Sequence, residues 1–175
     1  MPKQYIIYNS AQATIAAPVS QPTGTANRTM MQLRLALSVE ARLIAAGISF
    51  DGNTANVPGK VEIFETTVAA TMSTAFAAAD IQPFGPYSAA ANTAGATGVP
   101  FNLSTTTSGF ATAAVTEGTV AGYRPAWVGM LPPTQPWDYQ WPLGREFELT
   151  PQNYLRLRAT FANTVNMMAY FVIEL

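Results

Sequence analysis

The chain has 175 residues, of which only 11% are charged, and its net charge is −1 with a mean hydropathy of +0.13. Soluble domains carry about a quarter charged residues, so we expect neighbouring molecules to cover much of this surface. Scattered basic residues argue against binding of nucleic acid, and the absence of cysteine and histidine excludes disulfides, thiolate metal sites and His-dependent catalysis.

Residues 1–27 are rich in Ala, Thr, Pro, Gln and Ser, and show little hydrophobic periodicity. This composition predicts an extended N-terminal arm with at most one short strand near Tyr5 to Tyr8. The segment resembles no cleavable signal peptide, and no apolar run reaches the length that spans a bilayer. We therefore expect synthesis in the cytoplasm and no membrane partner.

The first strong pattern is the alternation of apolar and polar residues in TMMQLRLAL, residues 29–37. Such a period of two predicts a half-buried strand. A second strand is expected over residues 39–50 and a third over 60–69, with loop chemistry at DGNTANVPGK between them. A helix across Leu33 to Ala46 is the competing interpretation, because Leu, Arg, Ala and Glu favour helices. The strict alternation at the start favours strands.

Residues 66–122 form a long insertion rich in Ala, Thr, Ser and Gly, with only two charges, Asp80 and Glu117. Repeated Pro and Gly between Pro83 and Pro100 predict a long loop, and residues 108–119 predict another short strand. A helix within residues 67–81 is only weakly favoured. A solvated linker would carry more charge, so we expect this long loop, residues 82–102, to lie against another chain.

The last third contains three further patterns. Trp137, Tyr139 and Trp141 alternate along an extended segment and so share one face. Two alternating runs, residues 146–149 and 154–160, flank a Thr-Pro-Gln-Asn turn with Pro151 suited to a type I turn, which predicts a hairpin. The C-terminal run TVNMMAYFVIEL is apolar on both faces and predicts a central strand. Short strands and frequent turns predict an all-β antiparallel sandwich, jelly-roll-like, as one domain over residues 28–175.

In the predicted hairpin, Glu148 faces Arg156 and Glu146 faces Arg158. This cross-strand charge ladder would oppose a slipped register. The functional alternative is a carboxylate pair for glycoside hydrolysis. Arginines at matched spacing argue against that chemistry, because they lower the pKa that a general acid needs raised. We therefore expect no enzyme activity, no catalytic residue and no cofactor.

The aromatic row Trp137, Tyr139 and Trp141 has two interpretations. Exposed and coplanar, it would be a platform for sugar rings, and the protein a receptor- or glycan-binding module of a phage head or tail fibre. Buried, it would be core or subunit interface, where Trp and Tyr are enriched. We favour the interface. The acidic loop SFDGN offers only Asp51 and Asn53 as oxygen ligands, so no metal site is expected.

Three segments follow one another in the order GISFDG (residues 47–52), WPLGREFEL (141–149) and YLRLRATFANTVNMMAYFVIEL (154–175). Together they resemble a family of small proteins encoded among the virion structural genes of tailed bacteriophages and prophages. The resemblance covers the strand-rich beginning and the C-terminal third. It does not reach the arm or the Ala/Thr-rich insertion.

The resemblance implies a capsid decoration or cement protein on the outside of the virion head, bound to the major capsid protein and itself a homo-oligomer, expected as a trimer. It implies no catalytic residues. The arm and the insertion would then supply contacts to neighbouring subunits. The candidate interface residues are the aromatic row together with two aromatic residues from each of those two segments: Tyr5, Tyr8, Phe84, Tyr87, Trp137, Tyr139 and Trp141.

Overall fold

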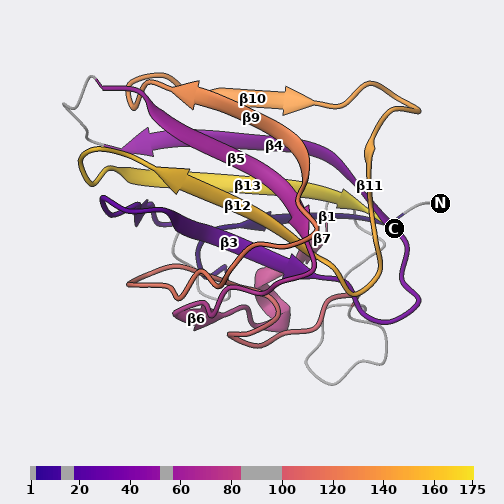
Figure 1. Cartoon of the computed structure of the whole chain (residues 1–175). Coiled ribbons are helices and arrows are strands. Elements are labelled where there is room, and N and C mark those ends of the chain that lie inside the picture. The colour runs from indigo at the N-terminus through magenta and orange to yellow at the C-terminus, as the bar shows by residue number, and fades with distance from the viewer. Residues whose placement is uncertain (1–2, 13–17, 52–56, 84–99) are drawn as a thin grey trace.

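The computed structural model describes residues 3–12, 18–51, 57–83 and 100–175. They form two antiparallel β-sheets packed face to face, with the long strands of each sheet running side by side (Figure 1). This arrangement confirms the predicted all-β sandwich. The jelly-roll connectivity stays a prediction.

Sheet A has β13 (Asn166–Glu174) at its centre, between β4 and β1. The C-terminal run is therefore a central strand, as its apolar character on both faces predicted. β13 pairs with β4 (Ala41–Asp51), β1 (Gln4–Tyr8) and the short β2 (Gln21–Pro22). Beyond β4 lie β10 (Trp137–Gln140) and β11 (Phe147–Leu149), and beyond β1 lies β7 (Gln82–Pro83).

Sheet B has β12 (Tyr154–Thr160) between β3 (Arg28–Arg34) and β5 (Gly59–Thr66). Beyond β5 lies β9 (Arg124–Leu131), and beyond β3 lie β8 (Gly109–Phe110) and β6 (Thr74–Ala75). A short 3-10 helix, η1, covers Ala78–Asp80. In the part of the chain that the structure describes, no helix is long and apolar enough to cross a membrane.

The three strands expected between residues 29 and 69 are present as β3, β4 and β5, and the competing helix is wrong. Part of the predicted arm belongs to the sandwich, because β1 pairs with β13 from Gln4↔Glu174 to Tyr8↔Tyr170. Its alternating burial, with Tyr5 and Ile7 fully buried, turns one side of β1 toward the opposing sheet.

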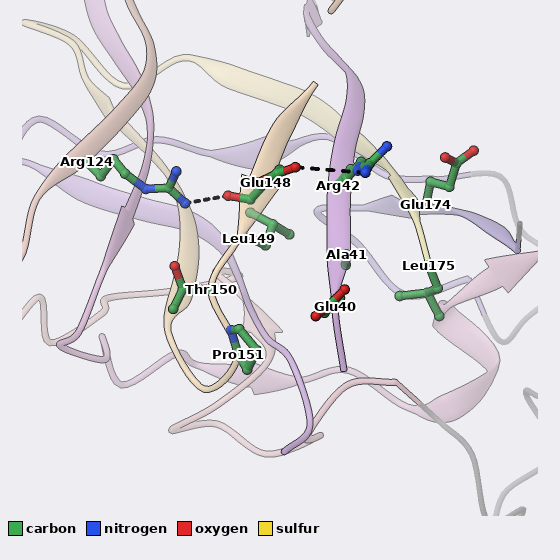
Figure 2. Close-up of a pocket in the computed structure, with 10 residues that line it drawn as sticks. All are labelled: Glu40, Ala41, Arg42, Arg124, Glu148, Leu149, Thr150, Pro151, Glu174 and Leu175. Carbon is green, nitrogen blue, oxygen red and sulfur yellow. Dashed lines mark hydrogen bonds and ion pairs between the residues drawn. The ribbon is translucent and has the colours of Figure 1, made fainter. Parts of the chain in front are cut away.

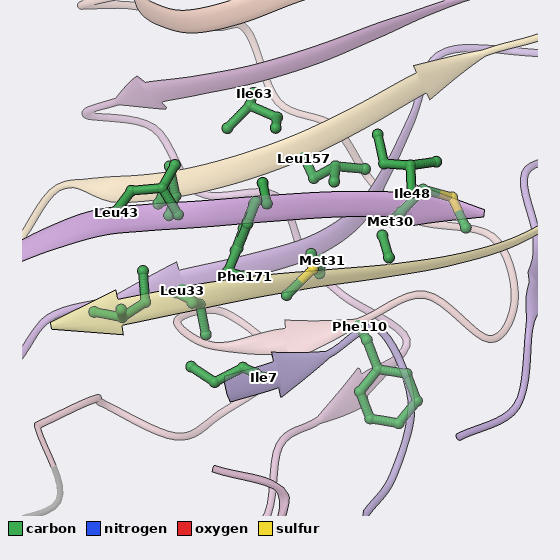
Figure 3. Packing of buried hydrophobic residues seen from close by; sticks show 14 of the residues in the cluster. Ile7, Met30, Met31, Leu33, Leu43, Ile48, Ile63, Phe110, Leu157 and Phe171 are labelled. Atoms are coloured by element: carbon green, nitrogen blue, oxygen red, sulfur yellow. The ribbon is translucent and has the colours of Figure 1, made fainter. Parts of the chain in front are cut away.

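The core lies between the two sheets and takes one face of each long strand. Phe171, Leu157 and Ile63 are fully buried there, and Figure 3 shows them packed beside Leu43 and Met31. These five residues belong to β13, β12, β5, β4 and β3, respectively. Because side chains alternate along a strand, each lies on the face of its strand that points into the core. The alternation read from the sequence is therefore the alternation between core and outer face.

The predicted hairpin between residues 146–149 and 154–160 is wrong. Strand β11 pairs with β4 in sheet A, whereas β12 lies in sheet B. The turn between them crosses from one sheet to the other, with Asn153 N–H donating to Thr150 O at 3.1 Å. Gln152 has φ of 67°, which is typical of position three of a type II turn and not of the expected type I.

The predicted charge ladder is wrong for the same reason, since its two strands are in different sheets. Glu148 lies opposite Arg42 on β4 and forms a long, exposed ion pair with it at 3.8 Å. Glu146 accepts a hydrogen bond from Gly144 N–H at 3.0 Å in the preceding turn. Arg156 and Arg158 instead face outward from sheet B and bind other carboxylates.

Arg156 is fully buried, although it lies on the outer face of sheet B, because the Ala/Thr-rich insertion covers it. Its guanidinium binds the carboxylate of Glu117 in that insertion and donates to the hydroxyl of Thr29 at 2.5 Å. Gln32 of β3 binds the same insertion: it donates to the carbonyls of Ala70 and Thr107 and accepts from Ala70 N–H. The described part of the insertion therefore packs on its own sheet, whereas most of the loop expected to lie against another chain, residues 84–99, lies outside the described residues.

A second charged cluster lies along β5 on the same outer face. Glu62 binds Arg158 at 2.8 Å and Lys60 at 3.2 Å, and accepts a hydrogen bond from the hydroxyl of Tyr123. Phe64 lies between the two arginines, with the guanidinium carbons of Arg156 and Arg158 at 5.4 and 4.9 Å from its ring centre. Cation–π contact and ion pairing together give this face a buried polar layer.

Glu65 lies on the other, inward-facing side of β5, opposite Leu155, and is almost fully buried. It accepts hydrogen bonds from Arg124, from the Asn153 side chain and from Thr150 N–H at 3.1 Å. Burial alone would raise the pKa of Glu65, but these hydrogen bonds outweigh it and hold the pKa below its ordinary value. Glu65 thereby joins β5 to β9 and to the crossing turn before β12.

We predict that Glu117→Gln lowers the free energy of unfolding by about 3 kcal/mol, because it leaves the buried Arg156 without a charged partner. The measurement is urea unfolding at pH 7. Glu148→Gln is the matched control: its ion pair is exposed, so a loss below about 1 kcal/mol is expected. Equal effects of the two substitutions would contradict a structural role for the buried pair.

We also predict acid destabilisation governed by Glu62 and Glu65, whose pKa values are both lowered in the folded chain. A lowered pKa contributes stability that is present above the ordinary value of 4.5 and is lost as the pH falls through the folded value. Glu65→Gln should be less stable than wild type at pH 7, and the difference should shrink toward pH 3. Exposed Glu40→Gln serves as control in thermal unfolding at each pH.

Candidate functional site: the side formed by β9 and β10

The edge strands β9 and β10 meet along one side of the sandwich, although they belong to different sheets (Figure 1). Trp127 of β9 and Trp137 of β10 join them, with ring centres 4.1 Å apart. Trp137 continues into Tyr139 at 6.1 Å with nearly parallel rings, and Tyr139 meets Trp141 edge-on at 5.0 Å. Aromatic side chains thus close the gap between the two sheets on this side.

Local sequence explains how the rings meet. Alternation along β10 places Trp137 and Tyr139 on one face, as predicted, and Asp138 on the other. Asp138 accepts a hydrogen bond from the hydroxyl of Tyr170 at 2.9 Å above Gly47, where an added Cβ would lie 2.1 Å from the Asp138 carboxylate. On β9, a Cβ at Gly129 would lie 2.4 Å from the indole of Trp127. Both glycines are therefore required by close approach of a neighbouring side chain.

Apolar side chains are exposed mainly on this side. Among the described residues, eight large apolar side chains are exposed, and five of them fall between residues 123 and 143. Leu143, at the tip of the turn after β10, is 97% exposed, and Met130 on β9 is 61% exposed. We call the following set the β9–β10 side: Tyr123, Trp127, Val128, Met130, Trp137, Tyr139, Trp141 and Leu143.

The aromatic row is a poor platform for sugar rings, because its flat faces already contact one another. Trp137 stacks between Trp127 and Tyr139, Trp141 is buried, and only Tyr139 is exposed. A sugar needs a free, accessible ring face to pack on. The geometry favours the packing interpretation of the row, with its outer margin available to a macromolecule.

The remaining candidate interface residues do not join this side. Tyr5 is fully buried in the core, where it meets Phe101 edge-on at 6.5 Å, so an interface role for it is wrong in this structure. Tyr8 is half-buried on the outer face of sheet A, 5.7 Å from Tyr170. Phe84 and Tyr87 lie outside the described residues.

An open cleft of about 560 Å³ lies beside β11, between Arg42 and Arg124 (Figure 2). Both cations are engaged: Arg42 binds Glu148, and Arg124 binds Glu65 and the carbonyl of Glu148. Figure 2 shows the Glu148 side chain directed at Arg42 while its carbonyl faces Arg124. Both arginines of the cleft are therefore paired within the chain, and we assign the cleft no ligand.

The structure also bears on the carboxylate pair Glu146 and Glu148. Hydrogen bonds from the backbone N–H groups of Glu146 itself and of Gly144 lower the pKa of Glu146, which is the wrong direction for a general acid. Within the described ranges, no group of three or more acidic residues could hold a metal ion.

Strand β9 was not predicted from the sequence. Its segment RPAWVGML alternates Trp127, Gly129 and Leu131 with Val128 and Met130, which is a strand pattern. The early proline and the glycine obscured it, because both are depleted in strands. Glu117 is an isolated charge in the sequence, and nothing near it indicates that it binds Arg156.

We predict that Trp137→Ala lowers the free energy of unfolding by about 2 kcal/mol, because it removes the ring that joins the two sheets on this side. Tyr139→Ala should cost less than about 1 kcal/mol, since that ring is largely exposed. Chemical unfolding followed by circular dichroism compares them. The reverse order of effects would mean that Trp137 does not hold the sheets together.

No protein-family model, no curated protein and no solved structure matches this chain. The likeness to phage virion proteins therefore stays a prediction, and what the chain does must be inferred from its own residues.

Proposed function

We propose that this chain is a structural virion protein of the capsid decoration or cement type, which binds the outside of a tailed-phage head and bridges subunits of the major capsid protein. The observation that carries the proposal is the gathering of exposed apolar side chains on the β9–β10 side of a chain with only 11% charged residues. Contiguous apolar surface is typical of a protein–protein interface.

The physical logic is that of a bridging protein. A protein that binds the assembled shell and not its separated subunits stabilises the shell by mass action. Such binding needs apolar area at the contact, and a rigid body on which that area is fixed. The β9–β10 side has both, because the contact between Trp127 and Trp137 joins the two sheets, and Val128 and Met130 of β9 and Leu143 after β10 remain exposed.

The proposal includes self-association as well as shell binding. The resemblance to phage virion proteins suggests three copies, and low net charge imposes little repulsion between them. Synthesis in the host cytoplasm followed by attachment to the completed head is consistent with this role.

The test is co-sedimentation of the purified protein with empty heads of the phage that encodes it, together with the temperature at which those heads disrupt. Saturable binding and a higher disruption temperature are expected. Leu143→Asp should weaken binding at least ten-fold, because it places a charge on the most exposed apolar side chain of the β9–β10 side. Leu37→Asp, which is also surface-exposed but lies outside this side, should not.

Two results would overturn the proposal. One is the absence of head binding by folded protein at micromolar concentration. The other is saturable quenching of tryptophan fluorescence by an oligosaccharide with no binding to heads, which would identify a glycan-binding module of a head or tail fibre.

A further inference from the structure

Strand β9 is a long sheet edge with an unused side. It is eight residues long and pairs only with β5 among the described strands. Apart from that pairing, no backbone hydrogen bond between described residues involves Arg124–Leu131. The other edge strands in the described part of the chain are shorter: β10 has four residues, β11 has three, and β7, β2 and β6 have two each.

The second half of β9 lacks the features that normally protect an edge. Folded proteins protect long edges with charge, proline, a bulge or very short length. Here the only charge is Arg124, at the first position and already bound to Glu65. Pro125 and the register shift opposite Ile63 and Phe64 are confined to the first half. Residues 127–131 are left free of all of these features.

We propose that β9 pairs with β9 of a second copy of this chain, antiparallel, so that the two six-stranded sheets join into one continuous sheet. A two-fold contact uses the same surface on both copies, so that surface must be self-complementary. In this pairing Val128 and Met130 of one copy lie beside Met130 and Val128 of the other, which places apolar side chains together.

Charge also favours this occupant. The antiparallel arrangement puts the two Arg124 side chains at opposite ends of the pair, so no like charges face each other. Any other pairing between two copies would join β9 to an edge of four residues or fewer, which offers fewer backbone hydrogen bonds. The inference does not rest on the proposed function. A two-fold contact cannot build a trimer by itself, but it can join two trimers.

The test uses the absence of cysteine from the chain. Val128→Cys, Met130→Cys and an equimolar mixture of the two are oxidised and run on a non-reducing gel. Opposed residues of an antiparallel pair have Cα atoms about 4.5–5.5 Å apart, within the range of a disulfide. In a pairing centred on Gly129, Val128 of one copy lies opposite Met130 of the other. The mixture should therefore give more cross-linked dimer than either cysteine variant alone. Leu37→Cys, 71% exposed and outside β9, is the control.

Sedimentation equilibrium of the full chain supplies the second readout. The wild-type protein should form an oligomer with an even number of copies. That number is two, or six if a three-fold contact also forms. Val128→Lys with Met130→Lys should raise the dissociation constant of the two-fold contact at least ten-fold, with unchanged circular dichroism, while Leu37→Lys leaves it unchanged.

Several results would overturn the inference. One is a wild-type monomer or trimer whose β9 cysteine variants cross-link no more than Leu37→Cys. Another is an even-numbered oligomer whose dissociation constant is unchanged by the Val128→Lys and Met130→Lys substitutions. A wild-type monomer that binds phage heads and loses that binding on introduction of the two lysines would assign β9 to a strand of the shell protein. That result would overturn self-pairing while leaving the proposed function intact.

Discussion

Arg156 places a full positive charge on a side chain with no exposed surface, and much of the chain is arranged around that constraint. A charge out of contact with water is tolerated only when it is paired and hydrogen-bonded. The Ala/Thr-rich insertion meets that need with the carboxylate of Glu117 and with backbone carbonyls from Val68 and Glu117. The insertion is thus fixed to sheet B by polar contacts in addition to the apolar side chains, Phe76, Phe101 and Phe110 among them, that it contributes to the core.

The same constraint explains why so few charges remain for the surface. Glu62, Arg156 and Arg158 engage partners on the outer face of sheet B, and Glu65 binds Arg124 on the inward-facing side of the same sheet, where it is almost fully buried. Charges used there cannot solvate the β9–β10 side. The described chain therefore has much of one face of sheet B covered by its own insertion and one side of the sandwich left apolar, and of these two surfaces the second is the one open to another molecule.

Local patterns predicted the strands well but not their partners. Alternation over residues 29–37 and 154–160 specified strands with one apolar face, because a period of two is a local property of the backbone. Contacts between residues 39, 96 and 127 positions apart leave no such trace, so the partners of Arg156 and Arg158 could not be predicted. Nearness in sequence suggested Glu146 and Glu148 instead, and these belong to the other sheet.

Pro151 did carry information about that crossing. Tight two-residue hairpins use turns whose first central residue has positive φ, and proline fixes φ near −65°. A turn with proline first and positive φ second, as at Gln152, splays the strands that it joins. Strands β11 and β12 therefore leave the turn in different sheets, and Glu65 binds both ends of it through Thr150 and Asn153. The proline that suggested a hairpin is thus the residue whose geometry sends the chain across the sandwich, which frees Arg156 to bind the insertion.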